Sequence, residues 1–530
     1  MRNTLLTTTA SIAALTIASF QPLAAQGESD QQGGTVHFET SCNEVAQRRF
    51  DRAIRYQHSF WYEHAKEIFD EALKADPTCA IAQWGIALTL LNNPHSAIPS
   101  ANLAPGLAAI QKAKAMGAKT ERERDYIDAM AVMYLDHEKT THRQRAVSFS
   151  KAMGELAAKY PKDDEAQIAY AITLNTSASP TDKTYAQQTK GAALLEPISK
   201  RMPQHPGVTH YLIHLYDYPE TAEKGLDAAN RYAKLAPTAP HAQHMPSHIY
   251  TRVGYWKESI VSNAAAAKAA QVDKEASNQL HGQDYMVYGH LQLGQDKSAR
   301  AVIDDMLASK NIGPNAFASQ FALAASPARY VVERGDWRGA AQLQPRQGPF
   351  SHTMAITHFA RALGAARSGD PEAAKADIAK LAELTDKLRE AKDAYWSEIV
   401  DIQRQVASAW VLAAEGKHDE ALRMMGAAAD AEDKTEKAPV TPGPLAPARE
   451  LYGVMLLDRG MAKEAFAAFE ATKAKEPNRF YGYAGAAQAA ERLGDKAKAK
   501  ENYEKLIALT ASADSERAEI AAARKFIAAN

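Results

Sequence analysis

The chain has 530 residues, with 62 basic and 63 acidic residues and a formal net charge of −1. No stretch concentrates basic residues with aromatic ones, so nucleic acid is not an expected partner. Beyond the N-terminal segment no apolar run reaches 18 residues, and we therefore expect no membrane span.

Residues 1–25 have the composition of a secretory signal. Arg2 is followed by an apolar run over 10–20 and by small residues that end at Ala25. Such a run is too short to cross a bilayer and is typical of a cleaved signal peptide. We predict a periplasmic or secreted protein whose mature chain begins with a linker over 26–42.

A 34-residue period appears near both ends of the mature chain. Ala53, Tyr56, Ala65, Phe69, Ala72 and Pro77 lie near the N-terminal end, and Gly453, Leu456, Ala465, Phe469 and Pro477 lie near the C-terminal end. Small, apolar and helix-stopping residues at this period are typical of two-helix tetratricopeptide (TPR) repeats. The sequence therefore predicts an all-α fold, a superhelical solenoid of TPR-like helical hairpins.

Cys42 and Cys79 are the only cysteines. Each lies just before the first helix of a predicted repeat, and neighbouring repeats place these helix starts side by side. In an oxidising compartment such cysteines form disulfides. We predict a Cys42–Cys79 bridge, and the alternative is two buried free thiols.

Seven glycines recur with an alanine or serine five residues later, a spacing that suits a helix end followed by a close helix contact. The pairs are Gly254/Ser259, Gly294/Ala299, Gly335/Ala340, Gly369/Ala374, Gly416/Ala421, Gly460/Ala465 and Gly494/Ala499. We divide the mature chain into a TPR-like solenoid over 43–310, further repeats over 311–431, a linker over 432–447 and C-terminal repeats over 448–530. Loops are predicted over 92–105 and 175–182.

Six of the 17 histidines lie between His205 and Trp256. A shift of 34 residues superposes His210 on His244 and His214 on His248. Residues three, four and seven apart share a helix face, so His241 joins its neighbours on one face. Pro246 removes a backbone donor within this run, which predicts a kink or a helix start near Met245.

Imidazole is a frequent ligand of transition metals. We predict a metal site formed by His210, His214, His244 and His248, with His241 and His281 as a fourth ligand or as outer partners. Alignment on Gly254 and Gly294 places His281, Asp284 and Tyr288 opposite His241, His244 and His248. The candidate catalytic proton partners are Asp217, Asp284 and Tyr288.

Two alternatives remain open for the histidine cluster: a polar groove that binds an anionic ligand or peptide terminus, and structural hydrogen bonding. HExxH, GxSxG, Walker and GxGxxG motifs are absent from the sequence.

The chain resembles exported bacterial multi-TPR proteins. The resemblance is carried by residues 79–87, by His205-Pro-Gly, by the run His241–Tyr250 that contains His-Met-Pro-Ser-His, and by residues 442–480. It implies fold and export rather than a reaction.

The sequence thus predicts a metalloenzyme, either a hydrolase or an oxidoreductase, or a metal carrier that binds copper, zinc or iron. A peptide or small-molecule ligand could share the groove. The alternative is a metal-free TPR scaffold that binds proteins or peptides.

Overall fold

The structure is a computed structural model that describes residues 33–179, 182–310, 312–313 and 316–530. The predicted signal peptide lies outside these residues. The N-terminal helices are α2 (Glu44–His58), α3 (Tyr62–Ala75), α4 (Ala80–Leu90), α5 (Ser100–Met116), α6 (Glu121–Tyr134), α7 (His142–Lys159), α8 (Asp164–Ser177) and α9 (Ala186–Arg201).

The middle of the chain forms α10 (Pro206–Tyr216), the short 3-10 helix η1 (Ala222–Gly225), α11 (Leu226–Leu235), α12 (Pro240–His244), α13 (Pro246–Arg252), α14 (Trp256–Val272), α15 (Ala276–Gln292), α16 (Asp296–Ala308), α17 (Phe317–Val332) and α18 (Trp337–Ala341). The remainder forms α19 (Ser351–Arg367), α20 (Pro371–Glu390), α21 (Ala394–Ala414), α22 (His418–Asp433), α23 (Ala448–Asp458), α24 (Ala462–Lys475), α25 (Phe480–Arg492), α26 (Lys496–Leu509) and α27 (Ala518–Ala529).

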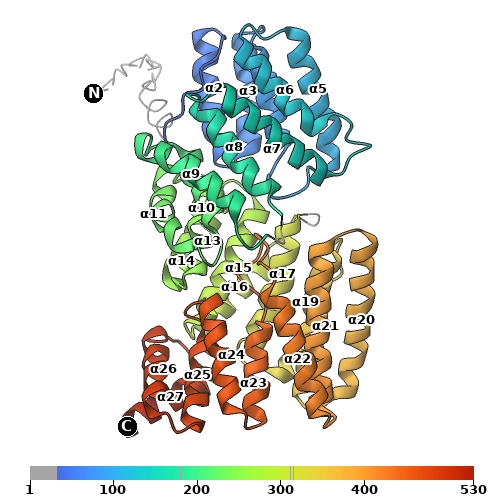
Figure 1. Ribbon diagram of the computed structural model, residues 1–530, viewed down its shortest axis with the longest axis vertical. Helices are drawn as coiled ribbons and strands as arrows, with labels where there is room; N and C mark the ends of the chain where they lie inside the picture. Colours follow the sequence, from blue (N-terminus) through green and yellow to red (C-terminus); the bar gives the residue numbers. More distant parts are fainter. Residues whose placement is uncertain (1–32, 180–181, 311, 314–315) are drawn as a thin grey trace, which may run out of the picture.

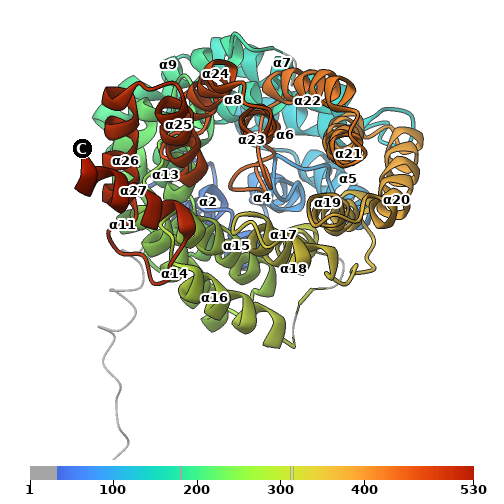
Figure 2. The same cartoon turned by 90° about the horizontal axis from the view of Figure 1, so that it is seen from below.

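Successive helices pair as antiparallel hairpins that stack into a superhelix (Figure 1). The fold class is all-α, as predicted, and the described residues contain no strand. Viewed along the long axis, the hairpins surround an interior (Figure 2). The interior matters because it receives the histidines.

The apolar residues of the period make the predicted hairpin contacts. Phe69 and Phe469 are fully buried. A Cβ on Gly453 or on Gly485 would lie 2.9 or 2.3 Å from the Phe469 ring, and one on Gly85 would lie 2.4 Å from the Phe69 ring. Glycine is needed at these positions because the ring of one helix lies directly on the backbone of the next.

All seven glycines of the predicted spacing have positive φ, between 65° and 90°. Each ends a helix in the left-handed region, where residues with a Cβ are strained. This part of the sequence analysis is confirmed.

After one superhelical turn the C-terminal repeats contact the middle of the chain. Trp256 donates from Nε1 to the Asn478 carbonyl at 2.7 Å. Arg517 forms a buried ion pair with Asp296, and Arg479 donates to the Tyr288 hydroxyl at 2.9 Å. These contacts hold α14–α17 between the two halves of the chain.

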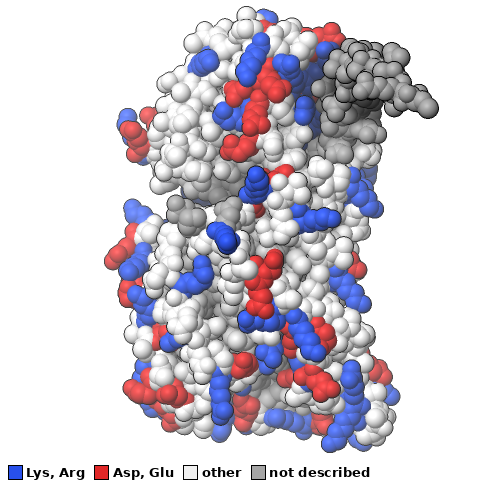
Figure 3. Space-filling view, turned by 180° about the vertical axis from the view of Figure 1, so that it is seen from behind, with Lys and Arg blue, Asp and Glu red and all other residues white. Residues whose placement is uncertain are grey.

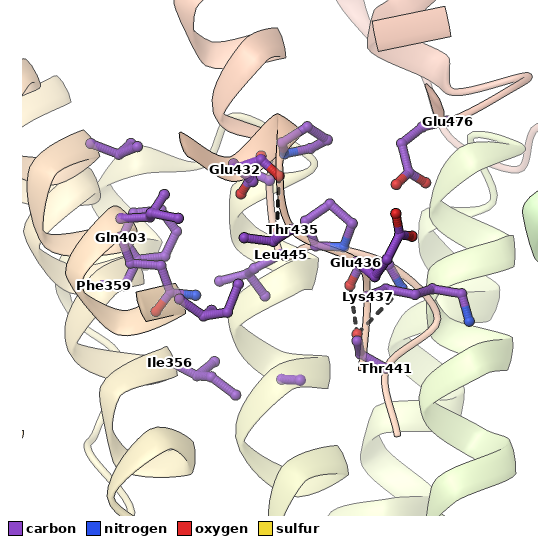
Figure 4. Close-up of a pocket in the computed structure, with 18 of the residues that line it drawn as sticks. Ile356, Phe359, Gln403, Glu432, Thr435, Glu436, Lys437, Thr441, Leu445 and Glu476 are labelled. Carbon is purple, nitrogen blue, oxygen red and sulfur yellow. Dashed lines mark hydrogen bonds between the residues drawn. The ribbon is translucent and has the colours of Figure 1, made fainter. Parts of the chain in front are cut away.

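The segment 432–447, predicted as a linker, passes into the interior (Figure 2). Lys437 is close to Asp217, 3.1 Å from its carboxylate, and Arg329 donates to the Pro444 carbonyl. A cavity with about 1090 Å³ of empty space lies between this segment and α19 and α21 (Figure 4). Residues 432–447 therefore form part of the molecule's interior wall.

Near the N-terminus Cys42 and Cys79 are joined as a disulfide, with Cα atoms 5.0 Å apart. The loop predicted over 92–105 is too long, because α5 begins at Ser100 and contains Pro105 in its first two turns. A proline so near a helix start costs few backbone hydrogen bonds.

The face opposite Figure 1 carries interspersed acidic and basic side chains without a large patch of one sign (Figure 3). Within the described ranges, none of the helices combines the length and the apolarity that crossing a membrane requires.

Candidate metal centre

The histidines stand on α10, on the kinked pair α12–α13 and on α15. Pro206 and Pro240 occupy the first turns of α10 and α12, where a missing N–H is tolerated. Pro246 starts α13, and Met245 between the two short helices keeps a helical φ of −51°. The helix assignment is interrupted at Met245, where Pro246 predicted a kink or a helix start, and His241 lies beside His210.

The first group of three consists of His210, His214 and His241, which we call the first triad. The Nε2 atom of His210 lies 3.1 Å from that of His214 and 3.2 Å from that of His241. His210 Nδ1 is 2.6 Å from the backbone carbonyl of His58. Since a carbonyl only accepts, Nδ1 carries the proton, and Nε2 of neutral His210 has only a lone pair.

The second triad consists of His244, His248 and His281. His248 Nδ1 lies 2.9 Å from Asp217 Oδ2, and His244 Nδ1 lies 2.7 Å from Asn263 Oδ1. Asn263 Nδ2 donates to the Ser259 carbonyl, which fixes its Oδ1 as the acceptor towards His244. Both Nδ1 atoms therefore donate.

The Nε2 atoms of His244 and His248 are 3.0 Å apart. When both rings are neutral, two lone pairs face each other across this distance with no proton between them. In the first triad, one lone pair of His210 faces two imidazoles but accepts only one hydrogen bond. A cation bound between the nitrogens removes both mismatches.

Burial lowers the pKa of these imidazoles and keeps them neutral. It lowers the pKa of His210 and of His281 to about 3, and it also lowers that of His248, against the opposing effect of Asp217. Burial alone would raise the pKa of Asp217, but Lys437 and Arg252 hold it well below its ordinary value. Asp217 is thus a charged acceptor that orients His248.

The triads adjoin one another. The ring centroids of His214 and His248 are 6.0 Å apart, and those of His241 and His244 are 6.2 Å apart. The arrangement can hold two ions, each with three nitrogens from neutral imidazoles.

The structure divides the predicted histidines differently from the sequence analysis. Four of them had been assigned to one site, with His241 and His281 as secondary candidates. In the structure His241 completes the group of His210 and His214, and His281 completes the group of His244 and His248. The reason is that each triad combines histidines from neighbouring helices: α10 and α12 form the first triad, and α12, α13 and α15 form the second.

Of the three candidate proton partners, only Asp217 contacts the cluster. The Asp284 side chain accepts from Ser326, and burial raises its pKa to about 6. The Tyr288 hydroxyl accepts from Arg479 at the contact with the C-terminal repeats. Neither of these two side chains hydrogen-bonds a triad histidine in the described part of the chain, and their role as proton partners stays a prediction.

Several neighbours of the triads were missed. The Tyr285 ring packs edge-on against His244, with centroids 4.8 Å apart, and its spacing of four from His281 could have revealed it. Phe60 stacks on His241, and the His95 ring lies tilted against that of His214, with centroids 4.2 Å apart. Both come from distant helices or loops, and no local sequence signal connects them to the cluster.

A third group, His58, Glu165 and His205, is fully buried beside the first triad. His205 Nδ1 accepts from the Val208 N–H, so its Nε2 donates to Glu165 at 2.8 Å. His58 Nε2 lies 3.1 Å from the other carboxylate oxygen, and its Nδ1 lies 3.1 Å from the Tyr211 hydroxyl. Every polar contact here is a normal hydrogen bond.

No family model matches the chain, and no curated protein matches it. The solved structures that match the chain include the following two. Yeast Tom70 is 11% identical over 92% of this chain and 96% of that chain, with a TM-score of 0.33. The Cut9–Hcn1 hetero-tetramer of APC/C is 10% identical over 91% and 95%, with a TM-score of 0.29. At these scores neither likeness bears on function.

Proposed function

We propose that the two triads hold a pair of transition-metal ions and that the chain is an exported metalloenzyme. The observation that supports this most directly is the pair of Nε2 atoms on His244 and His248, 3.0 Å apart with both Nδ1 protons already donated elsewhere. Ligands of a tetrahedral ion with metal–nitrogen bonds of about 2.0–2.1 Å lie about 3.3 Å apart. The observed spacing is close to this value.

Three protein ligands on each ion leave an open position, the pattern of catalytic rather than structural sites. Two neighbouring open positions suit the binding of a shared small ligand such as water or dioxygen. Asp217 and Asn263 fix the ring orientation and tautomer of their histidines, as outer partners of metal ligands do.

We favour copper over zinc and iron. All six ligands are neutral imidazoles, a donor that suits copper, and copper binds nitrogen sites most tightly among the divalent first-row metals. The one carboxylate in contact, Asp217, is already paired with Arg252 and Lys437. A buried pair of divalent ions would lack compensating charge, whereas monovalent copper halves that charge.

Metal analysis of the purified full-length protein tests the proposal. We expect two ions per chain in the wild type after copper loading, and one in each of the variants His210→Ala and His244→Ala. The matched control is His205→Gln, which keeps a donor for Glu165 and should keep both ions. Absence of metal from the wild type after reconstitution with copper, zinc and iron would refute the proposal.

The second candidate is a metal-free interaction scaffold. It is favoured by the stack of helical hairpins around an interior, an architecture whose concave face binds extended peptides. In this chain residues 432–447 already lie along part of that interior. If the wild type binds no metal, the interaction scaffold is the remaining candidate. Peptide capture by the purified chain would then be the next measurement.

A further inference from the structure

The N-terminal half contains a second cavity, with about 980 Å³ of empty space. Its wall is mainly apolar and aromatic and includes Phe38, Trp84, Tyr126, Met130 and Phe149. Part of this space is open to solvent, and the mostly apolar wall with a few polar groups is the lining typical of small-molecule sites.

Two residues of this wall have an unpartnered polar atom, His142 at Nδ1 and Gln57 at Oε1. Gln57 is 6% exposed, and its Oε1 atom has no hydrogen-bond partner. Burial of an amide oxygen without a partner is costly, and such a group is normally satisfied. Less than 1 Å² of this atom is exposed, so a ligand hydroxyl in the cavity would satisfy it once the Gln57 side chain turns towards the cavity; a hydroxyl bonds either atom of an amide.

The cavity adjoins the first triad. Phe60 belongs to the cavity wall, and its ring also contacts His210 and His241, with centroids 4.4 and 5.0 Å away. Phe60 thus lies between the cavity and the first triad, together with His58 and Tyr211, which line the cavity and also contact His210. Phe60 has a φ of +56°, and Asn92 on the same wall has a φ of +59°.

A non-glycine residue in the left-handed region is strained, and such strain gathers at binding sites and switch points. Two such residues stand in one cavity wall, between the helices and the loop before α5. Phe60 directly follows the C-cap residue of α2, a common place for a left-handed residue, and its ring lies against the imidazoles.

We propose that this cavity binds a small aromatic molecule with one hydroxyl group, held by the aromatic wall and by the Gln57 amide. Its role as the substrate site of the metal centre rests on the proposed function. Binding of the aromatic molecule requires the cavity but no metal. An experiment can therefore refute ligand binding without refuting the metal centre, and the reverse.

The test is calorimetric titration of the full-length protein, with and without metal, using 2-naphthol as probe. Its partner probe, 2-methoxynaphthalene, cannot donate a hydrogen bond. We expect 2-naphthol to bind about five- to tenfold more tightly, the value of one hydrogen bond. Gln57→Leu should remove this preference and retain binding of both probes.

Two variants distinguish binding in this cavity from binding in the cavity beside residues 432–447. Ala146 lines this cavity and Ala446 lines the cavity beside residues 432–447, and both are 8% exposed. Ala146→Trp should weaken 2-naphthol binding at least tenfold, and Ala446→Trp should leave it unchanged; circular dichroism checks that both are folded.

Equal binding to the wild type and Ala146→Trp, or no binding to the metal-free and metal-loaded wild type, would overturn the proposal. Binding of 2-naphthol by a chain that takes up no metal would retain the cavity and refute the metal centre. Metal uptake by a chain that does not bind 2-naphthol would retain the metal centre and refute the cavity proposal.

Discussion

Two buried histidine clusters adjoin each other at α10, and they differ in where the imidazole protons point. In the cluster of His58, Glu165 and His205, each ring proton faces an acceptor. In the triads, backbone or side-chain acceptors take the Nδ1 protons of His210, His244 and His248 and leave lone pairs facing one another. Both arrangements contain buried imidazoles, and the positions of the ring protons distinguish the hydrogen-bonded cluster, which includes a carboxylate, from the candidate ion site.

His58 belongs to both arrangements. Its ring bonds Glu165, while its carbonyl accepts from His210. The hydrogen-bonded cluster therefore positions the first triad, and the two can be separated by variants that affect stability or metal content alone.

The largest expected effect on stability is that of Glu165→Ala. Burial alone would raise the Glu165 pKa, but His58 and His205 hold it well below its ordinary value, so the carboxylate is charged. Its removal leaves two buried donors unpaired, which should cost about 3–5 kcal/mol of unfolding free energy. Urea denaturation measures this, and a loss below about 1 kcal/mol would contradict the account.

Removal of the disulfide should cost nearly as much. The Cys42–Cys79 bond closes a loop with a sequence separation of 37, which corresponds to about 3–4 kcal/mol in the chain-entropy estimate. The double variant Cys42→Ala/Cys79→Ala should have a lower urea midpoint that no longer responds to reductant. A wild-type midpoint that is itself unaffected by reductant would contradict this prediction.

Asp284 provides a test by pH. Burial raises its pKa to about 6, so the folded state retains a proton that the unfolded state releases above about pH 4. Stability conferred by this site is complete below pH 4 and decreases as pH rises to 6.

Asp284→Asn should therefore stabilise the protein by about 2 kcal/mol at pH 7 and have a much smaller effect at pH 4. Thermal melts at both pH values measure the difference. Metal content should not change, because Asp284 contacts Ser326 rather than a triad. An equal effect at both pH values would show that the carboxyl is not responsible.

The sequence predicted the features that depend on residues close together in the chain, and it did not predict those that depend on how distant helices pack. The seven glycines and the residues packed around Phe469 form a local period, so the helical hairpins were predictable. The histidines repeat over 34 residues, and their meeting was predictable too. Their division into triads depends on the kink at Met245 and on the angle between helices, which no periodicity encodes.

The partners of the histidines also divide into one that is near in sequence, which was predicted, and others that are distant in sequence, which were not. Asp217 lies three residues after His214 and was identified. The His58 carbonyl is a backbone group 152 residues from His210, and Phe60 reaches the triad from the same distant hairpin. Contacts between elements so far apart arise from superhelical curvature, which one sequence without its structure does not reveal.

The smallest predicted effect concerns Asn263, which is fully buried and contacts the second triad through His244 but not the first triad. In Asn263→Ala, His244 loses the acceptor that fixes its Nδ1 proton, so the tautomer with a protonated Nε2 becomes accessible. Loss of such an outer partner typically reduces metal affinity by about 10- to 100-fold. The second ion should therefore bind at least about tenfold more weakly while the first is unaffected, as measured by competition with a chelator. As a control, alanine at the exposed Asn230, whose side chain accepts from Tyr250 of α13, should leave both affinities unchanged. Equal weakening by both variants would mean that the histidine proton does not control the site.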